Sequence, residues 1–179
     1  CSSDLSEFLQ TAGSISPDGK LLAFTETPPE TGRDIWVMDL TDTSGPSKGH
    51  KGKPFLNTSA EDTAPKFSPD GKWLAYSSDE SGRREIYVQP FPGPGGKLLI
   101  STDGGQEPVW NPKGGELFFR SGTKMMAVDV DTKSGFSAGK PHMLFDGPYV
   151  LTSASFPFYD ISPDGQRDRK STRLNSSHT

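Results

Sequence analysis

The sequence predicts an all-β chain, a partial β-propeller of three four-stranded antiparallel blades followed by the first strand of a fourth. The prediction starts from a turn pattern in which an apolar residue precedes a small polar residue, Pro, a turn residue and Gly. It occurs four times, at Ile15–Gly19, Phe67–Gly71, Trp110–Gly114 and Ile161–Gly165. The prolines lie 52, 43 and 51 residues apart, a spacing typical of stacked supersecondary units. No window shows sustained helical periodicity, and 20 Gly and 16 Pro among 179 residues disfavour long helices.

Each turn is expected to reverse a strand, because Pro presets φ near −65° and Gly supplies the positive φ that follows. Short aromatic and aliphatic runs bounded by turn residues predict the next three strands of each unit. The second strands are predicted at 20–24, 72–76 and 116–119, the third at 34–38, 85–88 and 124–128, and the fourth at 54–56, 97–100 and 143–145.

The predicted blades occupy residues 6–58, 59–102 and 103–147, and residues 148–167 begin the next one. A single blade cannot bury both faces of its sheet, so neighbouring blades must cover each other. We therefore expect the aromatic residues that recur at equivalent blade positions to pack in the core and not to stack on a ligand. These are Phe24, Trp36, Trp73, Tyr76, Tyr87, Trp110 and Phe119.

Both ends of the chain are predicted to be non-native. Residues Asp168–His178 match the in-frame translation of a widely used short-read sequencing adapter, and Cys1–Leu5 match the reverse complement of that adapter in one frame. We therefore expect residues 1–5 and 168–179 to be adapter-derived, and residues 168–179 to be disordered. A mature lipoprotein also begins with Cys, but that interpretation requires a preceding signal segment.

The composition excludes several classes of function. A net charge of −4 without clustered Lys and Arg argues against a nucleic-acid partner. Cys1 is the only cysteine, so the sequence predicts neither a disulfide framework nor a thiol nucleophile. It also contains no apolar segment that would insert directly into a membrane.

No pattern for catalysis, metal binding or cofactor binding is complete. His50 and His142 have no ligand partner at zinc-site spacing. Asp129–Gly135 has Lys where a calcium loop needs a ligand, and Gly95–Lys97 lacks the other residues of a phosphate-binding loop. Gly-x-Ser-x-Gly does not occur. We therefore predict no catalytic, metal or cofactor residue and no enzymatic activity in this chain, and the ligand-binding residues stay unknown.

The residues also carry a family resemblance, which spans 6–167. Phe67–Ser78 together with Glu85–Val88 resembles the WD40-like, TolB-type propeller repeat, also called PD40. More narrowly, four strings are similar to the C-terminal propellers of bacterial membrane-anchored serine/threonine protein kinases: Val88–Gly93, Ser101–Gly105, Glu107–Trp110 and Tyr159–Arg167. No kinase motif such as His-Arg-Asp or Asp-Phe-Gly occurs in the chain.

The resemblance implies a non-catalytic sensing or protein-interaction module, a fragment of a larger bacterial signalling protein with an extracytoplasmic or periplasmic location. Its ligand, a protein or a small molecule, would bind at the loop face or in the central channel, where the blades converge. Two alternatives stay open. One is a TolB-like periplasmic propeller that docks an envelope protein, and the other is the propeller cap of a prolyl-oligopeptidase-like serine peptidase.

Overall fold

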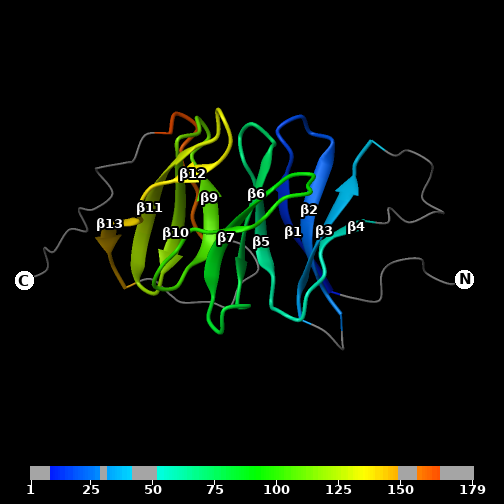
Figure 1. Cartoon of the computed structure of the whole chain (residues 1–179), viewed down its shortest axis with the longest axis horizontal. Helices are drawn as coiled ribbons and strands as arrows, with labels where there is room; N and C mark the ends of the chain where they lie inside the picture. The colour runs from blue at the N-terminus through cyan, green and yellow to red at the C-terminus, as the bar shows by residue number, and fades with distance from the viewer. Residues whose placement is uncertain (1–8, 29–31, 42–51, 149–156, 166–179) are drawn as a thin grey trace, which may run out of the picture.

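The computed structural model describes residues 9–28, 32–41, 52–148 and 157–165, which form three antiparallel sheets standing side by side (Figure 1). No helix occurs among these residues, and the predicted all-β, partial-propeller fold is confirmed. The two ends predicted to derive from an adapter, 1–5 and 168–179, lie outside the described residues.

Each sheet follows the chain as a meander. The first contains β1 (Leu9–Ile15), β2 (Leu21–Thr27), β3 (Asp34–Asp39) and β4 (Lys53–Leu56). The second contains β5 (Thr63–Phe67), β6 (Trp73–Ser78), β7 (Glu85–Pro90) and β8 (Leu98–Leu99). The third contains β9 (Gln106–Trp110), β10 (Glu116–Ser121), β11 (Lys124–Asp131), β12 (Ser137–Ala138) and β13 (His142–Asp146).

The repeated turns have the conformation that their residues predict. In the first turn, Ser16 Oγ donates a hydrogen bond to Asp18 Oδ1 (2.6 Å) and accepts one from the Leu21 amide (2.9 Å). Gly19 follows with a φ of 74°, which Gly adopts without steric cost. The serine–aspartate hydrogen bond recurs in the second and fourth copies. In the third copy Asn111 Oδ1 instead accepts from the Lys113 amide (3.0 Å).

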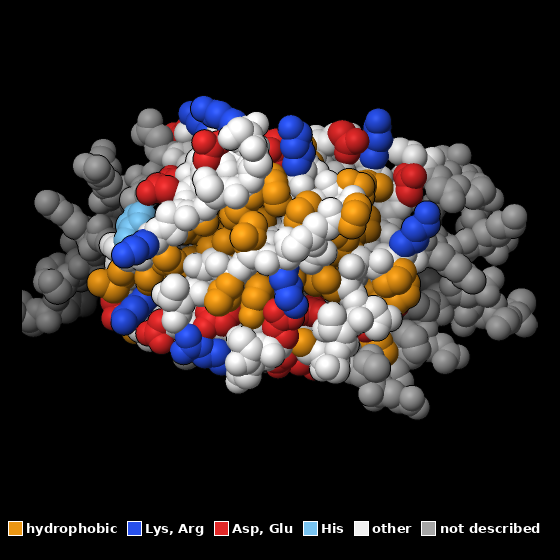
Figure 2. Space-filling model, viewed as in Figure 1, with side chains coloured by type: hydrophobic (Ala, Val, Ile, Leu, Met, Phe, Trp, Pro, Cys, Tyr) orange, Lys and Arg blue, Asp and Glu red, His pale blue; other side chains and the backbone are white. Residues whose placement is uncertain are grey.

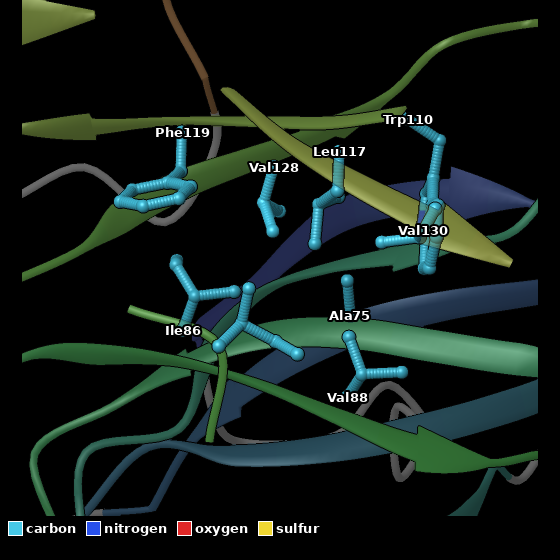
Figure 3. Packing of buried hydrophobic residues seen from close by; sticks show 9 residues of the cluster. Ala75, Ile86, Val88, Trp110, Leu117, Phe119, Val128 and Val130 are labelled. Atoms are coloured by element: carbon cyan, nitrogen blue, oxygen red, sulfur yellow. The ribbon is translucent and has the colours of Figure 1, made fainter. Parts of the chain in front are cut away.

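The core lies between neighbouring sheets. Between the second and third blades, apolar side chains from β6 and β7 face those from β9, β10 and β11 (Figure 3). A second cluster fills the junction of the first two blades and includes Ile35, Leu74 and Tyr76. Five of the seven aromatics predicted to pack are buried, while Trp36 and Trp73 are half-buried.

The third blade differs in detail from the prediction. Its third strand was predicted at 124–128, but β11 continues to Asp131, where Val130 pairs with Ala138 and its amide donates to the Gly115 carbonyl (2.9 Å). The blade therefore contains five strands, with β12 and β13 paired along the same side of β11.

The loop after the third strand of a blade reaches back to the preceding blade. Phe136, between β11 and β12, lies 5.0 Å from the Trp73 ring of the second blade and 6.4 Å from Trp110 of its own blade. Phe91, in the proline-rich loop after β7, lies 5.6 Å from Phe55 of the first blade. All three distances join ring centroids. These loops therefore link successive blades through aromatic contacts.

Residues 157–165, where the first strand of a fourth blade is predicted, form no ladder with the described residues. They follow β9 closely, because the Tyr159 hydroxyl donates to the Glu107 carbonyl (2.6 Å) and the Asn111 side-chain amide donates to the Gly165 carbonyl (3.4 Å). The segment therefore lies beside β9, the first strand of the third blade.

Hydrophobic side chains also reach the surface, forming a band across the middle of the face shown in Figure 2, with most charged side chains at its two rims. Among the described residues, Leu98 and Leu99 of β8 and Met143 of β13 are exposed. These strands lie at the sheet edges opposite β5 and β9.

Candidate functional site

The innermost strands β1, β5 and β9 lie next to one another, and β5 contacts both of the others. Three hydrogen bonds join them. Lys66 Nζ donates to the Gly13 carbonyl (2.9 Å), the Phe67 amide donates to Ser14 Oγ (3.0 Å), and Trp110 Nε1 donates to the Lys66 carbonyl (2.9 Å). The three strands therefore form one wall on the inner side of the blades.

An irregularity in the register interrupts each of these strands before the repeated turn. At equivalent places in β5 and β9, Ala64 and Glu107 have left-handed φ values of 54° and 59°, which are uncommon for residues other than Gly. Irregularities of this kind bend a strand and change the direction of its side chains. They precede Lys66 and Val109, which line the surface described next.

Two adjoining depressions run along this wall. The first, of about 440 Å³, is lined by Lys66, Val109 and the segment Pro157–Asp160. The second, of about 350 Å³, shares Lys66, Val109 and Asp160 with the first. Its other lining residues are Pro17, Phe67, Ser68, Pro69, Trp110 and Pro112. We call the two depressions together the inner groove.

The inner groove carries one charge of each sign. Burial lowers the pKa of Lys66, while the negative charge of Asp160 opposes that effect. No ion pair within 4.0 Å joins the two side chains. Apolar surface lies beside them, since Val109 is buried whereas Phe158 is exposed over 59% of its surface. The groove therefore presents separated charges next to an apolar surface.

A buried ion pair supports one side of the inner groove. Arg120 Nη1 lies 3.4 Å from Glu107 Oε2, and both side chains are almost fully buried. The same carboxylate oxygen accepts from the Phe158 amide (3.4 Å). Burial, with the Glu107 charge second, raises the pKa of Tyr159 well above its usual value. The phenol is therefore neutral near pH 7 and holds the segment against β9 as a hydrogen-bond donor.

The incomplete motifs found in the sequence lie only partly within the described residues. His142 lies exposed on β13, and His50 lies outside the described residues. Within the ranges that the structure describes, no cluster of three or more His, Cys, Asp or Glu could hold a metal ion. No helix there is long and apolar enough to cross a membrane.

The comparison with protein families decides the classification. The model of the TolB β-propeller domain, PD40, matches residues 4–144. The chain belongs to this PD40 family. Its repeated turns and meandering sheets are therefore those of a TolB-type propeller domain.

Two curated relatives are similar to this chain in sequence. The Tol-Pal system protein TolB of Hydrogenovibrio crunogenus is 32% identical over 73 residues, which are 41% of this chain and 16% of that protein. The uncharacterized peptidase YuxL of Bacillus subtilis is 28% identical over 106 residues, covering 55% of this chain and 15% of that protein. The PD40 chain thus spans less than a fifth of the length of either relative.

Solved structures agree on the fold. A putative TolB from Agrobacterium tumefaciens has a TM-score of 0.60 at 19% identity, covering 79% of this chain and 51% of that one. TolB from Acinetobacter baumannii has a TM-score of 0.59 at 23% identity, and the match covers 79% of this chain and 33% of that one. A structure from a study of two prolyl endopeptidases has a TM-score of 0.52 at 16% identity, and the match covers 79% of this chain and 22% of that one. At these identities the likeness concerns the PD40 propeller fold alone.

Sequence reasoning placed a ligand at the loop face or the channel but named no residue for it. A signal for the residues that line the groove was nevertheless present in the alignment of the four repeats. The position directly before the apolar residue of each turn is Ser14, Lys66, Val109 and Asp160 in the four copies. Its chemistry changes from copy to copy while the neighbouring turn residues recur, and three of these four residues line the inner groove.

Proposed function

We propose that this PD40 chain is a non-catalytic recognition module, and that its inner groove binds a segment of a partner protein or a small molecule. The observation that carries the proposal is the convergence of Lys66, Val109 and Asp160, from two blades and the following segment, on both depressions of the groove. Concave, largely apolar surfaces with a few convergent polar groups are the usual form of ligand sites.

The relatives support two settings for such a module. A TolB relative fits a periplasmic propeller that docks an envelope protein, and a peptidase relative fits a propeller that covers a hydrolase domain. A place at the C-terminal end of a bacterial serine/threonine kinase is supported only by the four sequence strings that resemble the propellers of such kinases. The TolB-like and peptidase settings are at least as well supported as the kinase setting.

A displayed library of random peptides tests the recognition role. We expect the chain to enrich peptides that lose binding when Phe158→Gln removes apolar surface from the groove. The matched control Leu98→Gln makes the same kind of change on the outer strand β8, where Leu98 is also exposed, and should leave binding intact.

The same experiment tests the absence of catalysis. Peptides eluted from the chain should be recovered with unchanged mass by mass spectrometry. Enriched peptides that are equally sensitive to both substitutions, or to neither, would refute recognition at the inner groove. Cleaved or modified peptides would refute the non-catalytic assignment.

A further inference from the structure

Lys66 has unused hydrogen-bonding capacity at the inner groove. An ammonium group has three donors, and the contact from Lys66 Nζ to the Gly13 carbonyl at 2.9 Å is its one hydrogen bond among the described residues. The side chain is only half-buried and lines both depressions. A ligand with a negatively charged group can therefore reach this ammonium.

Asp160 offers the complementary charge on the same groove. Its Oδ1 accepts the amide of Ile161 (2.8 Å), and that is the one hydrogen bond of this carboxylate among the described residues. Its charge acts on Lys66, yet the charged atoms of the two side chains are more than 4.0 Å apart. Both residues therefore line the same depressions without an ion pair between them.

The surface beside these charges is apolar and of limited size. Pro157 and Phe158 line the larger depression with them, and its volume of about 440 Å³ lies in the range of small-molecule sites. A dipeptide spans at most about 7 Å when extended. A ligand of this length is comparable in size to the depression that Lys66, Asp160 and Phe158 line.

We propose that the inner groove binds a short zwitterionic ligand, a peptide of two or three residues with free termini. The C-terminal carboxylate pairs with Lys66, the N-terminal ammonium pairs with Asp160, and an apolar side chain packs on Phe158. This inference rests on the proposed recognition role of the same groove and adds the chemical class of its ligand.

Titration calorimetry with the dipeptide alanyl-phenylalanine tests the inference on the unmodified protein. The free dipeptide is compared with its N-acetylated form and its C-terminal amide. Each block removes one charge from the ligand, so each is expected to weaken binding by about tenfold, as the loss of a charge-assisted hydrogen bond does. Blocked dipeptides that bind as tightly as the free one would overturn the inference.

Two variants identify which protein charge meets which terminus. Asp160→Asn keeps an oxygen for the Ile161 amide and should abolish the preference for the free over the N-acetylated dipeptide. Lys66→Met should likewise abolish the preference for the free dipeptide over the amide. Lys124→Met removes an exposed lysine on β11, away from the groove, and should leave both preferences unchanged.

Failure of this inference differs from failure of the recognition role. A longer peptide with blocked termini whose binding is sensitive to Phe158→Gln, combined with no preference for free termini, would overturn the zwitterionic ligand and retain recognition at the groove. Thermal unfolding of each variant shows whether it folds. If Lys66→Met does not fold, the three dipeptides on the unmodified protein still decide the outcome.

Discussion

Gly13 provides the sharpest test of how closely the first two blades pack, because a single methyl group does not fit there. A Cβ at this position would lie 2.5 Å from Pro65 Cγ, 2.8 Å from the Pro65 carbonyl oxygen and 2.9 Å from the Ala23 carbonyl oxygen. Two of these atoms belong to the backbones of β5 and β2, so a change of rotamer cannot relieve the contact. The Gly13→Ala protein must therefore shift β1 relative to β5.

The expected cost follows from two opposing effects. Overpacking a close contact costs about 1–3 kcal/mol. Replacing Gly by Ala stabilises the folded state by about 0.4–1 kcal/mol, because it lowers the conformational entropy of the unfolded chain. The midpoint of these ranges predicts that Gly13→Ala lowers the free energy of unfolding by about 1.3 kcal/mol. In a protein of this size, that corresponds to a fall in Tm of about 3–5 °C.

Urea denaturation followed by tryptophan fluorescence measures this difference. Gly96→Ala is the matched control, because a Cβ there meets no heavy atom within 4 Å and Gly96 has no positive φ. The control should be as stable as the unmodified protein or slightly more stable. Equal stability of Gly13→Ala and Gly96→Ala would refute the close approach of the first two blades.

Three further predictions concern the packing and its charges. Phe136→Ala removes the ring that contacts Trp73 and Trp110. It should lower the free energy of unfolding by about 1–3 kcal/mol in the same urea assay. Unchanged stability would show that the aromatic contact between the second and third blades does not stabilise the protein. Leu117→Ala, at a fully buried position in the cluster of Figure 3, should cost about 2–5 kcal/mol, and a smaller loss would show that the junction of the blades can collapse around the cavity. Burial raises the pKa of Asp62 above its ordinary value of 3.8, so the carboxyl binds a proton more tightly in the folded protein than in the unfolded chain. The free energy of unfolding should therefore increase as the pH falls through the raised pKa towards 3.8. Asp62→Asn should flatten that part of a plot of unfolding free energy against pH, and an unchanged slope would assign the effect to other groups.

The sequence was sufficient for the parts of the fold that depend on local chemistry. The Pro-Gly turns form from their own residues, as the hydrogen bond from Ser16 to Asp18 shows, and short apolar runs beside them can be recognised as strands. The contact of Phe136 with Trp73 could not be predicted in this way. It joins a loop of one blade to a strand of another, and neither segment contains a local signal for the other.

The shape of the inner groove depends on contacts between blades and could not be predicted from local chemistry, although the repeat alignment marks residues that line it. The position of these residues explains how such a module can change its ligand. Lys66 and Asp160 line the same groove because β5, β9 and the segment 157–165 lie beside one another, and an irregular register precedes Lys66. The turn that follows each of these positions is fixed by Pro, Gly and an apolar residue, whereas the groove position itself carries a hydroxyl, an ammonium, an aliphatic group or a carboxylate in the four copies. Because the repeat does not require one residue type there, substitutions at these positions can alter the charge of the groove while the turns and the core between the blades retain their residues. Binding specificity in this chain should therefore depend on the positions at which the repeats differ, and stability on the positions at which they agree.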